Sequence, residues 1–270
     1  MKYKNISSLE LFSKNNKINI ITSFPKSGNT WMRFIIYDLL FNKENISIDN
    51  SRIIKDRIPD LHNLKILDNK IFNNFLNEKN IFFKTHFSFQ QMKKLKLQIN
   101  KVIVVVRNPF DIFISLFNFY EISENQKDEM IDYFCSNHTL PFLNKFNLPN
   151  WEDHLKSWIN SGEDYHIVKY SNLIDNFENQ IKNLSDFLDI KVTDEKINFI
   201  KNNTQFENLK RIEISEREKN QEGFFTDSMI DKKSQFMNKG GYGNYKSFFN
   251  DSELKKLKRS FKNQFEDFEM

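Results

Sequence analysis

The segment Ile18–Trp31, INIITSFPKSGNTW, is the most informative about the fold. Its first half, Ile18–Phe24, is short and apolar and is closed by Pro25, which predicts a buried strand. A loop with one glycine, Gly28, follows, and Thr30–Phe41 then carries apolar residues at helical spacing, which predicts a helix. A strand, a glycine-containing loop and a helix in this order direct backbone N–H groups and a helix N-terminus at a phosphate.

Strands and helices alternate along the rest of the chain. We expect further strands at Ile81–Lys84, Val102–Arg107 and Tyr165–Tyr170, and helices at Phe110–Tyr120, Leu173–Leu188 and Asp194–Asn202. The β-branched run VIVVV is typical of a strand that is covered on both faces. The sequence therefore predicts an α/β fold, with a central parallel sheet flanked by helices and a P-loop-like phosphate loop after the first strand. Ligands of such folds bind beyond the carboxyl ends of the strands.

The chain of 270 residues shows no repeat and no Pro/Gly/Ser-rich linker, so we expect one domain over 1–270. Residues 1–16 form a polar lead-in. Residues 207–235, which are polar and charged, are a candidate mobile lid over the site. A formal net charge of +4 excludes a histone-like polycation and leaves room for a basic pocket that binds a small anion. We expect no nucleic-acid partner.

Cysteine usage and hydropathy indicate the compartment. Cys135 is the single cysteine, so the chain has no intrachain disulfide and no multi-cysteine metal site. No signal peptide is visible, and no apolar run reaches about 18 residues. These features predict a cytoplasmic protein without a membrane span and without a metal site.

The loop after the first strand, FPKSGNTW, combines the charge of Lys26 with the short polar side chains of Ser27, Asn29 and Thr30. It is not a Walker A loop, G-x-x-x-x-G-K-[ST], because it has one glycine and Lys26 precedes it. The other interpretation is a tight turn that caps a helix. On this segment alone the two interpretations weigh evenly.

Two further strands end in groups suited to chemistry. His86, in the segment KTHF, is placed at the ligand edge, where an imidazole can act as a general base. The remaining histidines are interpreted as structural or solvated: His62, His138, His154 and His166. Arg107, in the segment RNPFDIFIS, can bind a phosphate with its planar fork, and Ser115 lies about two turns along the next helix. The alternative for Arg107 is an ion pair with Asp111.

A fourth segment, FMNKGGYGNYKSFF over Phe236–Phe249, places three of the six glycines beside Lys239. Several glycines close together beside a lysine let the backbone approach an anion closely. The alternative is a flexible turn before the last helix.

Together the four segments resemble sulfotransferases of the cytosolic type, which use 3′-phosphoadenosine 5′-phosphosulfate as donor. The first is similar to that family's 5′-phosphosulfate loop, Tyr-Pro-Lys-Ser-Gly-Thr-Thr-Trp, and the second to its Lys-Thr-His element. The third is similar to its 3′-phosphate segment, with Arg and Ser eight residues apart. The fourth resembles its stretch Arg-Lys-Gly-x-x-Gly-Asp-Trp-Lys. The resemblance extends from Ile18 to Phe249, nearly the whole chain.

The resemblance implies a role for each matching residue. The residues that would hold the 5′-phosphosulfate end are Lys26, Ser27, Gly28, Asn29 and Thr30. Those that would hold the 3′-phosphate are Arg107, Ser115, Lys239 and Gly240. Those that would form the nucleoside pocket are Trp31 and Phe206, on either side of the adenine, with Tyr170 and Thr204. The catalytic residues would be His86 as the base, Lys26 at the leaving oxygen, and Lys84 at the sulfuryl group.

The sequence departs from the family pattern at several positions. Asn238 stands where the family has Arg, Asn244-Tyr245 where it has Asp-Trp, and Asn29 where it has Thr. The family's dimer motif, Lys-x-x-x-Thr-Val-x-x-x-Glu, would begin at Lys246. Its later positions are degenerate, being filled by Asn250, Asp251 and Lys255.

Two other functions are weighed. A P-loop nucleotide kinase or NTPase would need the order Gly-Lys-Ser/Thr and a Mg²⁺-holding acid after a strand, whereas these strands end in His and Arg. A non-catalytic nucleotide-binding module is the second alternative. We expect the acceptor to be a small-molecule or glycan hydroxyl. A sugar, a phenol and an aliphatic alcohol all remain as alternatives for it. Aromatic residues that line an apolar acceptor pocket or belong to the core are Phe87, Phe89, Phe117, Phe119 and Tyr120.

Overall fold

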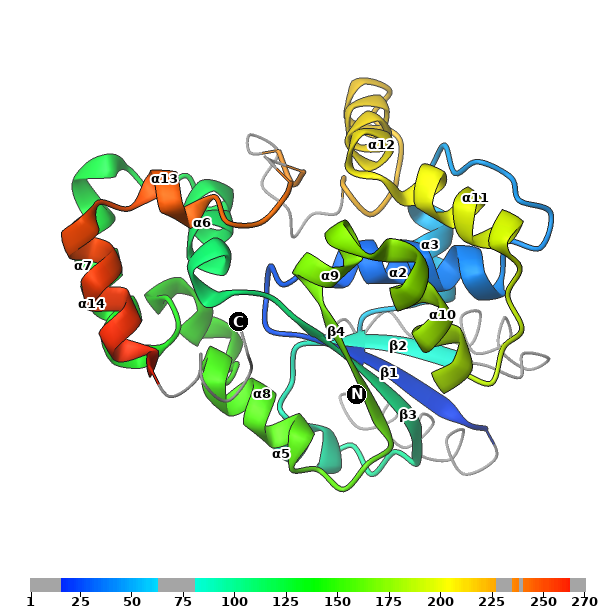
Figure 1. Cartoon of the computed structure of the whole chain (residues 1–270), viewed down its shortest axis with the longest axis horizontal. Helices are drawn as coiled ribbons and strands as arrows, with labels where there is room; N and C mark the ends of the chain where they lie inside the picture. Colours follow the sequence, from blue (N-terminus) through cyan, green and yellow to red (C-terminus); the bar gives the residue numbers. More distant parts are fainter. Residues whose placement is uncertain (1–15, 63–80, 227–234, 238–239, 263–270) are drawn as a thin grey trace.

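The computed structural model describes residues 16–62, 81–226, 235–237 and 240–262. Its centre is a four-stranded sheet of β1 (Ile18–Thr22), β2 (Ile81–Thr85), β3 (Ile99–Val106) and β4 (Tyr165–Lys169). All pairs are parallel, and the strand order is β2-β1-β3-β4 (Figure 1). The predicted α/β fold is therefore confirmed. The loops that follow the four strands lie along one edge of the sheet.

Helices cover both faces of this sheet. The α-helices are α2 (Asn29–Leu40), α3 (Arg52–Arg57), α5 (Phe89–Lys93), α6 (Pro109–Phe119), α7 (Lys127–Asn137), α8 (Trp151–Ile159), α9 (Tyr170–Asp175), α10 (Phe177–Phe187), α11 (Asp194–Thr204), α12 (Phe206–Glu218), α13 (Tyr245–Phe248) and α14 (Asp251–Ser260). Two short 3₁₀ helices, η2 (Glu124–Gln126) and η3 (Pro141–Phe146), flank α7. In Figure 1, α6, α7, α13 and α14 gather on the left, and α2, α10 and α11 on the right.

Alternating residues of the strands divide the hydrophobic core into two clusters. Val102, Val104 and Val106 of β3 pack in one cluster with residues of α6, α7 and α8. Ile103 and Val105 pack in the other with residues of α2, α10 and α11. Because side chains alternate along a strand, a strand that is apolar at every position is covered on both faces. This is the arrangement that the run VIVVV predicts.

The prediction of one helix over Leu173–Leu188 is wrong in one respect. The structure has two helices, α9 and α10, which are separated at Asn176, where φ is −143° and ψ is 48°. Asparagine favours such breaks because its side chain competes for backbone hydrogen bonds. Tyr170, expected at the end of a strand, is the first residue of α9.

The candidate lid, residues 207–235, begins within α12, and its residues 227–234 lie outside the described residues. Movement of this segment stays a prediction. The polar lead-in lies outside the described residues up to residue 15, as do Asn238 and Lys239. Among the described helices, none has the length and apolar character that crossing a membrane requires.

Candidate active site

The loop between β1 and α2 presents backbone N–H groups at the carboxyl edge of the sheet. Its backbone is left-handed at Lys26, with φ of 65°, and at Gly28, with φ of 103°. Gly28 is the N-cap of α2, and no side chain caps that helix. The first N–H groups of a helix have no partner within the helix, so an uncapped N-terminus is suited to an anion. The buried Ser27 hydroxyl has no hydrogen-bond partner among the described residues.

Glycine is favoured at position 28 by the left-handed backbone and also by the close approach of a neighbouring side chain. A Cβ atom at this position would lie 2.6 Å from Cδ2 of Tyr170. The phosphate loop therefore packs directly against the aromatic ring at the start of α9. The Trp31 ring meets that same ring edge-on, with the centroids 5.4 Å apart.

The residues expected to form the nucleoside pocket are brought together from distant parts of the chain. Trp31 Nε1 donates to Thr204 Oγ1 at 3.3 Å, and Thr204 Oγ1 in turn donates to the Ile200 carbonyl at 2.8 Å. Phe206 packs beneath the C-terminal glycine loop, since a Cβ at Gly240 would lie 2.7 Å from its Cδ2. These contacts place α2, α11, α12 and the glycine loop around one site.

Arg107, at the end of β3, links three of the predicted segments. Its Nη1 donates to the Lys26 carbonyl at 3.1 Å, and its Nη2 donates to the Gly241 carbonyl at 3.1 Å. Its guanidinium carbon lies 4.4 Å from the centre of the Tyr170 ring. The buried Nε–H has no hydrogen-bond partner among the described residues.

Asp111 holds the glycine loop instead of pairing with Arg107. Its carboxylate accepts hydrogen bonds from the backbone N–H of Gly243 at 2.8 Å and of Tyr245 at 3.4 Å. Ser115 lies on α6, as its spacing from Arg107 predicts, and its side chain is half-buried. Lys239 lies outside the described residues, so its part in the site stays a prediction.

His86 follows β2, and its hydrogen bonds fix the ring. Its Nδ1 lies 2.6 Å from the Ser23 carbonyl. A carbonyl oxygen only accepts, so Nδ1 carries the proton and Nε2 keeps its lone pair. Burial, together with the nearby Lys84 and His62, holds the pKa of His86 well below its usual range. The ring is therefore a neutral imidazole near pH 7 and can accept a proton through Nε2.

The structure adds two residues to this cluster that sequence reasoning did not assign to a site. Lys84 Nζ pairs with Asp60 Oδ2 at 2.7 Å. His62 Nε2 accepts the backbone N–H of His86 at 2.9 Å, and the backbone N–H of His62 donates to Asp60 Oδ1 at 2.9 Å. The signal in the sequence is weak, because Asp60 and His62 precede β2 by about twenty residues and follow no strand.

Electrostatics in the cluster follow from burial. Burial alone would raise the pKa of Asp60, but Lys84, His62 and His86 outweigh it and hold that pKa well below its ordinary value. Burial, followed by the charge of Lys84, lowers the pKa of His62 to about 4. Near pH 7 the cluster therefore holds an ionised Asp60 beside two neutral imidazoles, paired with Lys84, whose own pKa is lowered by burial.

Lys26 is half-buried between two aromatic rings. Its Nζ lies 4.2 Å from the centre of the Phe119 ring and 3.9 Å from that of the Phe236 ring. Burial and the charge of Arg107 lower the pKa of Lys26 to about 7, while Glu213 acts in the opposite direction. Its protonation is therefore sensitive to pH in the neutral range.

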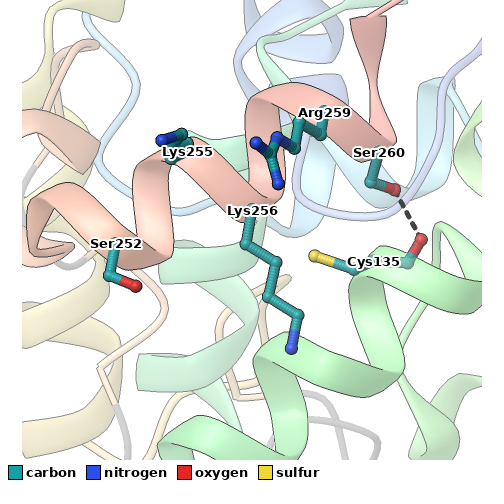
Figure 2. A pocket seen from close by; sticks show the side chains of 6 residues that line it. All are labelled: Cys135, Ser252, Lys255, Lys256, Arg259 and Ser260. Carbon is teal, nitrogen blue, oxygen red and sulfur yellow. Dashed lines mark hydrogen bonds between the residues drawn. The ribbon is translucent and has the colours of Figure 1, made fainter.

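A separate hollow lies between α7 and α14, and Figure 2 shows the side chains that line it. Its lining contains none of the predicted site residues. The lining residues are Cys135, Ser252, Lys255, Lys256, Arg259 and Ser260.

Comparisons with known proteins identify the family. The model of the sulfotransferase domain family matches residues 17–269. The chain is 28% identical over 259 residues to mouse sulfotransferase 1B1, covering 90% of this chain and 81% of that protein. It is 24% identical over 276 residues to the amine sulfotransferase of rabbit, covering 98% of this chain and 86% of that protein.

Solved structures share the fold. The structure of mouse sulfotransferase SULT7A1 complexed with PAP superposes with a TM-score of 0.63 at 19% identity, over 97% of this chain and 90% of that one. Retinol dehydratase in complex with androsterone and PAP gives a TM-score of 0.63 at 18% identity, over 94% and 82%. With a family model that spans nearly the whole chain, and with the four predicted segments on the edge of an α/β sheet, the protein belongs to the sulfotransferase domain family.

Proposed function

We propose that this sulfotransferase moves a sulfuryl group from 3′-phosphoadenosine 5′-phosphosulfate to an acceptor hydroxyl or amine, with His86 as the general base. The observation that carries the proposal is the hydrogen bond that fixes the tautomer of His86. Its Nδ1 is committed to the Ser23 carbonyl, so Nε2 is the basic nitrogen that is left for the reaction. The donor supplies, when bound, an activated sulfuryl group on a phosphate leaving group.

The residues after β1 fit the 5′ end of such a donor. The uncapped N-terminus of α2 and the unpartnered hydroxyl of Ser27 are hydrogen-bond donors that suit phosphate oxygens. The loop residues assigned to this end are Lys26, Ser27, Gly28, Asn29 and Thr30. A Cβ at Gly28 would crowd the Tyr170 ring, so glycine is favoured there and the loop backbone can approach a ligand closely.

The 3′-phosphate is assigned to Arg107, Ser115, Lys239 and Gly240. Two carbonyls and the face of Tyr170 fix the Arg107 guanidinium, so little side-chain entropy is left to lose on binding. The adenine is assigned to the region between Trp31 and Phe206, bounded by Tyr170 and Thr204. Two structural neighbours were solved in complex with PAP, which supports this assignment.

The proposed chemistry divides among three side chains. His86 Nε2 takes the acceptor proton as the acceptor oxygen or nitrogen attacks, and general-base catalysis of this kind contributes roughly 10²–10⁴-fold. Lys26 stabilises the negative charge that develops on the leaving phosphate oxygen, and Lys84 stabilises the sulfuryl group during transfer. Asp60 keeps Lys84 in place through their ion pair. Because burial lowers the pKa of His86, the imidazole is unprotonated and ready to act near pH 7.

The acceptor is proposed to be a small molecule whose apolar part contacts aromatic side chains. Phe87 and Phe119 are half-buried near the site, and Tyr120 lies against Phe142 with ring centroids 4.0 Å apart. Phe117 is buried at 4% exposure and belongs to the core. The structural neighbour retinol dehydratase is described in complex with androsterone, which supports an apolar acceptor class.

Location and assembly are also part of the proposal. We place the enzyme in the cytoplasm, in line with relatives named cytosolic sulfotransferases. We also propose that the family's usual dimer contact is altered. One of the degenerate motif positions, Asn250, has a local role here, because it forms a capping box with Glu253 at the start of α14.

The test compares His86→Ala with His166→Ala, since His166 lies near the amino end of β4, at the opposite edge of the sheet. Turnover of labelled donor with a panel of hydroxyl and amine acceptors should fall at least about 100-fold in His86→Ala. Calorimetric affinity for the 3′,5′-bisphosphate product should stay within a few-fold of wild type. Near-normal turnover in His86→Ala would remove the base assignment. Thermal stabilisation by ATP with Mg²⁺, and not by the bisphosphate, would favour the nucleotide kinase alternative.

A further inference from the structure

Two buried glutamates on α12 each hold the backbone of a distant segment. Glu213 is 1% exposed and Glu216 is not exposed at all. The Glu216 carboxylate accepts the N–H of Ser51 at 2.5 Å and of Phe225 at 3.4 Å. The Glu213 carboxylate accepts the N–H of Phe236 at 2.6 Å and of Met237 at 2.7 Å. Burying a carboxylate costs free energy unless it is hydrogen-bonded or paired, so these contacts indicate a specific structural role for each glutamate.

Glu213 acts on the phosphate loop through Phe236. Arg217 supports the carboxylate with Nε at 3.0 Å and Nη2 at 2.9 Å, both to Oε1. The ring of Phe236 lies 3.9 Å from Lys26 Nζ and packs edge-on against the ring of Phe119, with the centroids 5.9 Å apart. Phe236 also packs against Phe224 and Phe225 with centroids 5.5 and 5.7 Å apart. A chain of contacts thus runs from α12 to the lysine of the phosphate loop.

We propose that Glu213 is a positioning residue for sulfuryl transfer: it fixes residues 236–237 so that the Phe236 ring holds the Lys26 ammonium against Phe119 at the sulfuryl end of the donor site. The inference deepens the proposed function and rests on the role given there to Lys26. Contacts with two aromatic rings hold a cation in position and favour its charged form. Glu213 does not touch the reacting atoms itself.

The charge of Glu213 adds to this effect. The charged groups that act on Lys26 are Arg107, at the end of β3, and Glu213, on α12. Arg107 disfavours the ammonium and Glu213 favours it, while burial disfavours it most. Removal of the carboxylate therefore shifts Lys26 toward its neutral form at a given pH. Neutral Lys26 neither attracts a phosphate nor stabilises a leaving oxygen.

The experiment measures two properties of Glu213→Gln: the single-turnover rate, and the affinity for the 3′,5′-bisphosphate between about pH 6 and 9. The rate should fall roughly 10- to 100-fold, as for a misplaced catalytic group. The pH above which bisphosphate affinity declines should move down by about half a unit to one unit, which corresponds to a lost cation–π contact. Lys26→Met should show no such decline at all, which assigns the midpoint to Lys26.

Three comparison variants separate positioning from general stability. Glu218→Gln, exposed on the same helix, should match wild type in rate and in pH midpoint. Glu216→Gln should lower the melting temperature and leave the pH midpoint unchanged. Phe236→Leu should shift the midpoint as Glu213→Gln does, and the double variant should be no worse than the more severe single one, because both break the same contact.

The inference is overturned if Glu213→Gln behaves as Glu216→Gln does, with lower stability and an unchanged midpoint. Full additivity of the Glu213 and Phe236 effects would also overturn it. Failure of the proposed function has a different signature, since wild type would then transfer no sulfuryl group while the pH dependence of bisphosphate binding could still be measured.

Discussion

Replacement of Gly28 by alanine tests whether the phosphate loop and the nucleoside pocket form one packed unit. The residue has φ of 103° and ψ of 13°, and a left-handed backbone costs a residue with a side chain about 1–2 kcal/mol. The new Cβ would also lie 2.6 Å from Cδ2 and 3.1 Å from Cε2 of Tyr170. Overpacking a filled site costs typically about 1–3 kcal/mol. Together the two effects predict that Gly28→Ala lowers the free energy of unfolding by about 2–5 kcal/mol.

Gly162→Ala is the matched control. Gly162 also has a positive φ, 78°, but a Cβ added there would meet no described atom within 4 Å. It should therefore show only the backbone cost of about 1–2 kcal/mol. The difference between the two variants measures the contact with Tyr170. Chemical denaturation of both proteins, with the midpoint and the slope recorded, provides the comparison.

The same substitution should weaken binding of the 3′,5′-bisphosphate by at least about tenfold, because Tyr170 supports both Trp31 and Arg107. Gly162→Ala should bind normally. In a Tyr170→Ala background, Gly28→Ala should cost no more than Gly162→Ala costs in wild type. Equal stability of Gly28→Ala and Gly162→Ala, or a Gly28→Ala penalty that persists without the Tyr170 ring, would show that the loop does not pack against Tyr170 as described.

Three further outcomes are expected. Arg107→Ala should weaken the 3′,5′-bisphosphate by about 1.5–3 kcal/mol and an analogue without the 3′-phosphate much less, so equal losses in calorimetry would contradict the assignment. Bisphosphate affinity of wild type should decline as pH rises through the Lys26 pKa of about 7, since the charged ammonium binds the anion, and Lys26→Met should be flat over the same range. Asp60→Asn should lower stability at pH 7 by about 3 kcal/mol, because it leaves Lys84 without its partner. The pKa of Asp60 is lowered on folding, so its contribution is present above about pH 4 and is lost as the pH falls further; pH-dependent unfolding of Asp60→Asn should lack that acid loss.

Local patterns in the sequence are enough to predict the sheet and the edge at which the site lies. Strand and helix patterns are local, because burial of a strand on two faces requires an unbroken apolar run such as Val102–Val106. The phosphate loop is equally local, since a strand, Gly28 and a helix are consecutive in the chain. His86 and Arg107 could be assigned because each directly follows a strand of a parallel sheet. The break at Asn176 was missed, because one asparagine within a helical pattern is a weak signal.

The remaining side chains of the site, and the charge states of its titratable groups, depend on the packing of distant segments. Asp60 and His62 precede β2 by about twenty residues, yet they hold Lys84 and His86. Glu213 reaches Phe236 over 23 positions, and Arg107 reaches Gly241 over 134. No spacing rule predicts such pairs, because they depend on how helices pack on the sheet. The lowered pKa values of Lys26 and His86 have the same origin, since burial in the folded protein is their largest cause.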